Sequence, residues 1–445
     1  MSILIKNAQL VNEDKTYFAS VLVNNKRIES IITGDDLPEA DKVIDAHGKL
    51  LIPGLIDDQV HFREPGLTEK AEIATESRAA VAGGITSYME MPNTVPQAVT
   101  VELLEEKYNR AAQVSAANYS FFLGTTNYNL EELLKLDEKK VCGVKIFMGS
   151  STGDMVVDDA KALEEVFANV KTLIATHCED DPMIKANTKK AIEKYGDAIP
   201  MSEHPHIRSR EACYKSSSFA VGLAKKHGTR LHILHISSKE ELDLFENDKP
   251  LEEKHITSEA CVHHMWFGGK EDYEKFGSRI KWNPAVKERS DAEAILQAVI
   301  DDRIDVIATD HAPHTKEEKS GSYLKAPSGG PLVQHALLAM LEFWKDQKIT
   351  LTKIVEKMCH NPAKMFAIEE RGFIREGYYA DLVLVDPNAK TKVEEKDLLY
   401  KCGWSPFEGY EFNNAVAMTM VNGEVMWDGE KVTDKNAGMR LTFDR

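Results

Sequence analysis

A regular succession of short apolar runs between residues 54 and 367 constrains the fold more than any other feature of this chain. Each run has the length of a β-strand, and stretches of helical character separate one run from the next. Continuous apolar strands that alternate with helices indicate a parallel sheet buried on both faces. The eight predicted strands are residues 54–61, 85–91, 119–123, 143–147, 173–177, 231–235, 256–260 and 306–310. Eight such strands favour a closed (β/α)8 TIM barrel over an open sheet.

The predicted helices between these strands follow the usual rules for helix ends. Thr68 followed by Glu72 is typical of a helix start, and Gly83-Gly84 is typical of a helix end. The predicted helices include residues 68–82, 101–117, 161–167, 208–226 and 290–301.

The segments on either side of the barrel are β-rich, and hairpin signals occur at Asn422-Gly423 and Asp428-Gly429. We therefore predict that residues 1–53 and 368–445 form one small composite β-sheet domain. Residues 54–367 would form the (β/α)8 barrel beside it.

The charge of the chain excludes some classes of partner. Lysine and arginine number 55 against 72 acidic residues, a formal net charge of −17, whereas nucleic-acid or anionic-membrane binding needs a basic surface. The six cysteines show no CxxC spacing, which favours reduced thiols. No signal-peptide core or membrane-spanning run is evident. We expect a cytoplasmic protein that acts on a small molecule, without nucleic-acid or membrane partners, as a homo-oligomer such as a dimer.

Three histidines end three of the predicted strands: His61, His177 and His235. For any one of them, an ordinary core or surface histidine is the simpler interpretation. In a parallel barrel, however, residues at the carboxyl ends of strands converge on one face, so three such positions together favour a hydrolytic metal centre. His232 lies three residues before His235, and an odd spacing in a strand predicts opposite faces. We therefore assign the ligand role to His235.

Lys145 and Asp310 occupy two further strands of the predicted barrel. A buried ammonium at Lys145 would be costly, so either the side chain extends outward or its amine has reacted with carbon dioxide. The resulting carbamate could bridge two cations, and the pattern alone leaves both interpretations open. Asp310 begins the cluster Asp310-His-Ala-Pro-His314, where a carboxylate can both ligate a metal and carry a proton. A helix N-cap is the alternative role, but it does not account for the density of this cluster.

Arg63 and Asn93 follow the first and second predicted strands. Arginine is the side chain best suited to hold a carboxylate with two hydrogen bonds, and an amide can assist it. The competing interpretations are a salt bridge from Arg63 to Glu64 and an Asx turn at Asn93.

Several of these fragments occur in the same order in a known family. They are Pro53-Gly-Leu-Ile-Asp, Val60-His-Phe-Arg-Glu-Pro-Gly66, Met91-Pro-Asn-Thr94, Leu231-His-Ile-Leu-His-Ile-Ser237, Asp310-His-Ala-Pro-His314 and Trp404-Ser-Pro-Phe-Glu-Gly409. From Pro53 to about Asn422 the chain resembles the dihydroorotases of the amidohydrolase superfamily. Within this superfamily, the second and fifth of these fragments, with the patterns His-x-Arg-Glu-Pro-Gly and Asp-His-Ala-Pro-His, separate dihydroorotases from hydantoinases and allantoinases.

The resemblance implies zinc-dependent, reversible hydrolysis of dihydroorotate to N-carbamoyl-aspartate in pyrimidine synthesis. It implies one or two zinc ions: His61 and Asp310 would hold one, His177 and His235 the other, and carboxylated Lys145 would bridge them. Asp310 would also move the proton. The remaining roles implied by the resemblance concern the substrate: Arg63, Asn93 and His314 for its carboxylate, and Asn283 with the Ser328-Gly329 backbone for its ring.

Two departures from the family pattern leave alternatives open. Gln59 stands where the family has the first histidine of His-x-His, which predicts a weaker second metal site. Some bacterial members bridge their metals with an aspartate, and Asp154 follows Lys145 in this chain. The alternatives are a non-catalytic scaffold, which Gln59 favours, and a hydantoinase- or allantoinase-like enzyme, which Arg63 and Asn93 disfavour.

Overall fold

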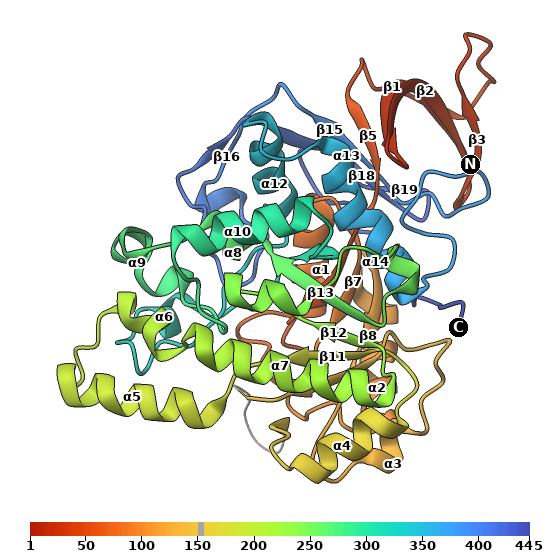
Figure 1. Ribbon diagram of the computed structural model, residues 1–445. Coiled ribbons are helices and arrows are strands. Elements are labelled where there is room, and N and C mark those ends of the chain that lie inside the picture. Colours follow the sequence, from red (N-terminus) through yellow and green to blue (C-terminus); the bar gives the residue numbers. More distant parts are fainter. Residues whose placement is uncertain (150–154) are drawn as a thin grey trace.

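The computed structural model describes residues 1–149 and 155–445, and its central feature is the predicted barrel (Figure 1). Val60 and His311 form a parallel bridge between the first and last strands, and the His61 amide donates to the His311 carbonyl at 2.7 Å. The neighbouring strands pair in parallel, so the (β/α)8 prediction is confirmed. The barrel strands are β6 (Leu55–Val60), β7 (Ile85–Glu90), β8 (Asn118–Phe121) continued by β9 (Leu123–Gly124), β10 (Val144–Phe147), β11 (Ile174–His177), β12 (Leu231–Ile233), β13 (Ile256–Cys261) and β14 (Val306–Ala308).

Helices surround these strands and bury their apolar faces against them (Figure 1). In α4, for example, the buried residues Leu163, Val166 and Phe167 recur at the three- and four-residue spacing of one helix face. The main helices are α1 (Ile73–Ala82), α2 (Val101–Val114), α4 (Ala160–Asn169), α5 (Asp181–Tyr195), α7 (Arg210–His227), α10 (Arg289–Ile300) and α12 (Ala336–Lys345).

The predicted start of the first helix is wrong. Helix α1 begins at Ile73 rather than Thr68, and its N-cap residue Glu72 makes no side-chain capping bond. The Ile73 amide instead donates to Glu64 Oε2 at 2.9 Å. A carboxylate outside the helix therefore satisfies one of the free amides at its start, which the local capping pattern does not reveal.

Strands from both termini form one mixed sheet, as predicted. Its order is β19-β18-β15-β5-β1-β2-β3, with β4 paired to β1. The N-terminal and C-terminal strands join at β5, which pairs parallel with β1 and antiparallel with β15. The strands are β1 (Ser2–Asn12), β2 (Lys15–Asn24), β3 (Arg27–Ile32), β4 (Lys42–Asp45), β5 (Leu50–Pro53), β15 (Leu382–Asp386), β18 (Ala415–Val421) and β19 (Glu424–Trp427).

Parts of the C-terminal region lie against the barrel as well as in this sheet. The Leu441 amide donates to the Tyr119 carbonyl at 2.9 Å beside β8, and Trp404 Nε1 donates to the His314 carbonyl at 2.7 Å. The hairpin of β18 and β19 turns at Asn422-Gly423, where both φ angles are positive, as its two-residue signal predicts. In the described ranges, no helix combines the length and apolar character that crossing a membrane requires.

Candidate metal centre

A cavity of about 600 Å³ opens where the barrel strands end. Its size is that of a site for a small molecule. It is lined by every described residue with a predicted site role: His61, Arg63, Asn93, Lys145, His177, His235, Asn283, Asp310, His314, Ser328 and Gly329. Gln59 lies in the same lining.

Two of the predicted ligands form a close pair at one side of the cavity. His177 Nδ1 lies 3.0 Å from His235 Nε2, and both side chains are buried. The opposite nitrogen of His177 lies 2.9 Å from Glu179 Oε2, and Arg208 pairs with the same carboxylate oxygen at 2.5 Å. A carboxylate that accepts a hydrogen bond from one ring nitrogen directs the other nitrogen's lone pair toward a metal. Burial lowers the pKa of both histidines, which keeps the rings neutral as ligands.

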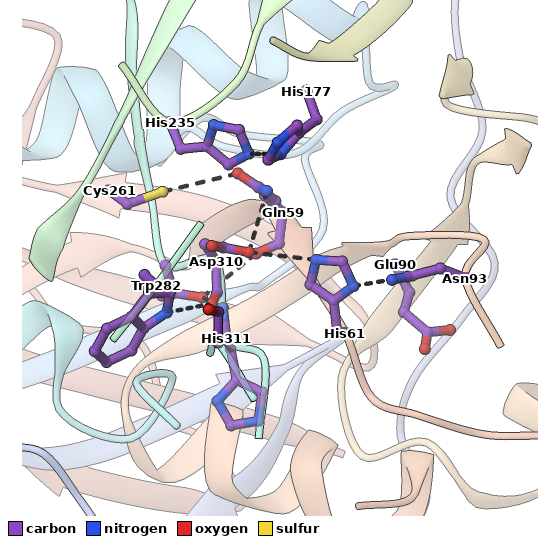
Figure 2. Close-up of polar contacts among 12 residues, drawn as sticks. Gln59, His61, Glu90, Asn93, His177, His235, Cys261, Trp282, Asp310 and His311 are labelled. Carbon is purple, nitrogen blue, oxygen red and sulfur yellow. Dashed lines mark hydrogen bonds and ion pairs between the residues drawn. The ribbon is translucent and has the colours of Figure 1, made fainter. Parts of the chain in front are cut away.

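His61 and Asp310 form the second close pair. His61 Nε2 lies 3.3 Å from Asp310 Oδ1, and His61 Nδ1 lies 2.8 Å from Asn93 Oδ1. The Asn93 amide oxygen therefore orients His61 in addition to facing the cavity. Figure 2 shows Gln59 between this pair and the pair of His177 and His235.

Gln59 is held at both ends of its amide. Its Nε2 donates to Asp310 Oδ1 at 3.1 Å, and its Oε1 lies 3.7 Å from Cys261 Sγ (Figure 2). Burial raises the pKa of Asp310 to about 7, against the opposing effects of His177, Lys145 and Arg63. The Asp310 carboxyl group can therefore take up and release a proton near neutral pH.

Lys145 points into the cavity rather than outward. Its side chain is 1% exposed, and Nζ makes no hydrogen bond to any residue in the described ranges. Burial lowers the pKa of Lys145 to about 7, although Glu259 and Asp310 act in the opposite direction. The amine is thus partly neutral and nucleophilic at physiological pH. Asp154, the alternative bridging residue, lies outside the described residues.

The other side of the cavity carries cationic groups. Arg63 Nε donates to the Pro313 carbonyl at 3.1 Å, and one terminal nitrogen of Arg63 lies 3.2 Å from His314 Nε2. Lys70 Nζ lies 3.4 Å from His314 Nδ1. Burial lowers the pKa of His314 to about 3, so this ring is neutral and its neighbours supply the positive charge. The predicted carboxylate site thus has a fixed guanidinium, although both nitrogens of His314 already face protein groups.

The last predicted residues line the cavity next to Trp282. Asn283 Oδ1 is buried and makes no hydrogen bond within residues 1–149 and 155–445, so it is free to bind a ligand. His314 Nε2 lies 3.0 Å from the Ser328 carbonyl. Gly329 has a φ of 122°, and a Cβ there would lie 2.4 Å from the Ala312 carbonyl oxygen, so only glycine fits.

One orientation inferred from strand periodicity is wrong. His232 does not face away from the barrel interior: its Nε2 lies 3.2 Å from Asp58 on β6, which is not a neighbour of β12 in the barrel. Strand β12 ends at Ile233, and His235 has a positive φ of 41°. The two-residue alternation therefore stops before His235, and both imidazoles point inward at different depths.

Some residues of the site were missed from the sequence. Glu179 follows His177 by two residues, which was an available signal for a carboxylate partner. Lys70 comes from a loop with no distinctive local pattern. Trp282 Nε1 lies 3.4 Å from the Asp310 carbonyl, and Cys261 contacts Gln59, contacts that only the closed barrel creates.

The chain was compared with known proteins. Residues 50–426 match the amidohydrolase family. The dihydroorotase of Halobacterium salinarum is 33% identical over 416 residues, which cover 93% of this chain and 94% of the relative. The dihydroorotase of Lactobacillus helveticus is 32% identical, with 97% and 100% covered.

The solved structures that resemble the chain include hydantoinases. The L-hydantoinase (dihydropyrimidinase) from Arthrobacter aurescens has a TM-score of 0.93 and 27% identity, with 99% of each chain covered. The dihydropyrimidinase from Brevibacillus agri has a TM-score of 0.88 at 24% identity over the whole of both chains, which supports the fold alone.

The barrel, the cluster of ligand-type side chains at its strand ends and the family match agree: the chain belongs to the amidohydrolase family. Its full-length relatives and structural neighbours narrow this class to the cyclic amidohydrolases. The resemblance to dihydroorotases extends over nearly the whole chain, as the sequence motifs predicted.

Proposed function

We propose that this protein is a zinc-dependent dihydroorotase, which interconverts dihydroorotate and N-carbamoyl-aspartate in pyrimidine synthesis. The observation that carries the proposal is the buried guanidinium of Arg63, in the same cavity as the two pairs of ligand-type side chains. Burial lowers the pKa of Arg63 to about 10, so the group stays charged at neutral pH. A cyclic amide with a carboxylate is the substrate that best matches this cation.

The side chains around the cavity fit zinc. His177 Nδ1 and His235 Nε2 are 3.0 Å apart, and Lys145 Nζ between the strands is an orphaned buried amine. In our proposal His177 and His235 would hold one ion, His61 and Asp310 would hold another, and carboxylated Lys145 would supply further oxygen ligands. Bound zinc supplies Lewis acidity, which activates water and polarises the amide carbonyl.

Side chains of the protein would bind the substrate and transfer the proton. Arg63, fixed by the Pro313 carbonyl, holds the substrate carboxylate with Asn93 beside it, and His314 packs behind the guanidinium. Asn283 and the Ser328-Gly329 backbone face the ring. Asp310 would accept the proton of the attacking water at its carboxylate and deliver it to the departing ring nitrogen, a general acid–base role.

The direct test compares two ring substrates on zinc-loaded protein. We expect hydrolysis of dihydroorotate and much slower hydrolysis of dihydrouracil, the same ring without the carboxylate. Preference for dihydrouracil or hydantoin would favour a hydantoinase-like enzyme. Loss of all turnover at full zinc occupancy would favour a non-catalytic scaffold.

Arg63→Lys is expected to raise KM for dihydroorotate by roughly tenfold, about 1.4 kcal/mol, with a smaller change in kcat. Lysine keeps the charge but loses the planar fork that matches a carboxylate. Steady-state kinetics with dihydroorotate and dihydrouracil would measure both effects. The matched control is Arg289→Lys, at a half-exposed arginine that begins α10 and pairs with Asp272. If KM for dihydroorotate does not change, Arg63 does not bind the carboxylate.

Lys145 is expected to bind carbon dioxide with a pH dependence set by its lowered pKa. The neutral amine reacts, and the ammonium does not. Since burial lowers the pKa to about 7, the carbamate should grow in as the pH rises through that value at constant dissolved carbon dioxide. A ¹³C NMR carbamate signal from labelled bicarbonate would report it, and Lys145→Gln should remove the signal. A signal that persists in Lys145→Gln would assign the carbamate to another lysine.

A further inference from the structure

A second cluster of ligand-type side chains lies inside the barrel, below the cavity. It consists of Asp58 on β6, His232 on β12 and Glu259 on β13, all 0% exposed. His232 Nε2 lies 3.2 Å from Asp58 Oδ2 and 3.8 Å from Glu259 Oε2. One ligand atom of each residue lies within 4.8 Å of the other two. Asp58 and Glu259 each precede, along their strands, a residue nearer the cavity: Gln59 and Cys261.

The hydrogen bonds of His232 determine which ring nitrogen carries the proton when the imidazole is neutral. The Thr257 hydroxyl donates to the Leu231 carbonyl at 3.3 Å, so it accepts from His232 Nδ1, which lies 2.8 Å away. Nδ1 therefore carries the ring proton of the neutral imidazole. The lone pair of Nε2 then points toward Asp58 and Glu259, an arrangement that is repulsive unless a positive charge lies between them.

The carboxylates of the cluster lack hydrogen bonds where they face one another. Within the described ranges, no hydrogen bond reaches either oxygen of Asp58, Oε2 of Glu259 or Nε2 of His232. The other oxygen of Glu259 is used, since it accepts from the His235 amide at 2.9 Å and from Cys261 Sγ at 3.2 Å. Buried carboxylates without donors are costly and need a compensating cation.

We propose that Asp58, His232 and Glu259 bind a divalent transition-metal ion, with zinc as the best match, at a structural site distinct from the metal centre in the cavity. Zinc–ligand bonds of about 2.1 Å in tetrahedral geometry place neighbouring ligand atoms about 3.4 Å apart, close to the separations at His232 Nε2. One imidazole with two carboxylates is a ligand set that zinc accepts. The Thr257 hydroxyl orients the imidazole, as partners of metal-bound histidines commonly do.

A proton is the competing occupant. Burial lowers the pKa of His232, but Asp58 and Glu259 outweigh it and raise the pKa to about 9, so the position attracts positive charge from either source. A proton on Nε2 would form an ion pair with Asp58 Oδ2 at 3.2 Å, but the described atoms do not form a well-aligned hydrogen bond there, and Glu259 Oε2 would stay without a donor. A metal ion bound by all three residues would give a partner to His232 Nε2, Glu259 Oε2 and the Asp58 carboxylate at once.

The bound ion would tie three barrel strands together below the cavity. Because Glu259 also accepts from the His235 amide, it would hold the backbone of one predicted ligand of the cavity. The role is therefore structural, and it is independent of the proposed dihydroorotase activity.

The test removes the ligands in the cavity and counts the zinc that remains. In the triple variant His61→Asn, His177→Asn and His235→Asn, we expect about one zinc ion per chain after gel filtration, by mass spectrometry of the metal. X-ray absorption should show a nitrogen and oxygen shell with one imidazole. Adding Asp58→Asn should abolish this zinc, and a chelator should lower the Tm of the triple variant.

The control is Asp305→Asn in the triple variant, which neutralises a buried carboxylate paired with Lys254 at 2.7 Å instead. It should keep the zinc. If the Asp58→Asn protein does not fold, the triple variant alone decides. A folded triple variant without zinc, in which ¹⁵N NMR shows both nitrogens of His232 protonated, would overturn the proposal in favour of a proton.

Discussion

Asp310→Asn is expected to lower kcat for dihydroorotate by roughly 10²–10⁴-fold while the barrel remains folded. The amide keeps an oxygen that can face a metal and can still meet Gln59 Nε2, which now lies 3.1 Å from Asp310 Oδ1. It cannot take up a proton, whereas burial raises the pKa of Asp310 to about 7 and suits it to that task. Stopped assays with dihydroorotate at saturating zinc would measure the loss, and circular dichroism would check the fold.

The chain offers a matched control on the same strand. Asp305 and Asp310 flank β14 at opposite ends, and both are buried. Asp305→Asn should reduce stability, since Lys254 loses its partner, but leave the kcat of the folded enzyme near that of the native protein. If Asp310→Asn retained more than about a tenth of kcat at unchanged zinc content, Asp310 would not be the proton carrier.

The barrel, and the convergence of His61, His177, His235 and Asp310 on its cavity, could be predicted from the sequence because both depend on where the strands end. Phe147 and His177 are register partners at the ends of adjacent strands, so the last residues of β10 and β11 must lie at one face. The same geometry brings His61 and Asp310 within 3.3 Å although they are far apart in the chain. A polar residue at the end of a predicted strand therefore indicates a site that residues far apart in the sequence form together.

The contacts that the sequence did not reveal depend on side chains from non-adjacent strands or on local backbone strain. Nothing near Asp58 or His232 in the sequence indicates that they meet inside the barrel. The shared inward direction of His232 and His235 arises because β12 ends before His235, whose positive φ is uncommon for a residue with a Cβ. The late start of α1 follows from Glu64, which reaches the Ile73 amide from outside the helix.

The anionic substrate that we propose is compatible with an acidic chain, because the charge inside the cavity differs from the overall charge. The net charge of −17 belongs to the whole molecule, whereas Arg63 and Lys70 line the cavity itself. Asp310, the carboxylate among them, has a raised pKa because burial disfavours its charge. Cations that line the cavity can therefore favour a negatively charged substrate even though the whole protein is negatively charged.

Gln59→His is expected to raise the zinc affinity of the site formed by His61 and Asp310 by about 10-fold or more, a change typical of altered ligand surroundings. An amide oxygen is a poorer zinc ligand than imidazole. In the native protein, moreover, Gln59 Nε2 is directed at Asp310 and Oε1 at Cys261 Sγ. Both ends of the amide are thus engaged with protein groups, so Gln59 contributes little to holding an ion there.

Zinc titration against a competing chelator would measure this affinity, and activity at limiting zinc would follow it. The native site of His177, His235 and Lys145 should fill first, because each of its ligands is an imidazole or an anionic carbamate. Gln59→Asn, which keeps an amide but shortens its reach, should give no gain, and His61→Asn should remove the weaker ion and so identify it. Two equally tight ions in the cavity of the native protein, unchanged in Gln59→His, would show that the amide at this position does not weaken the site.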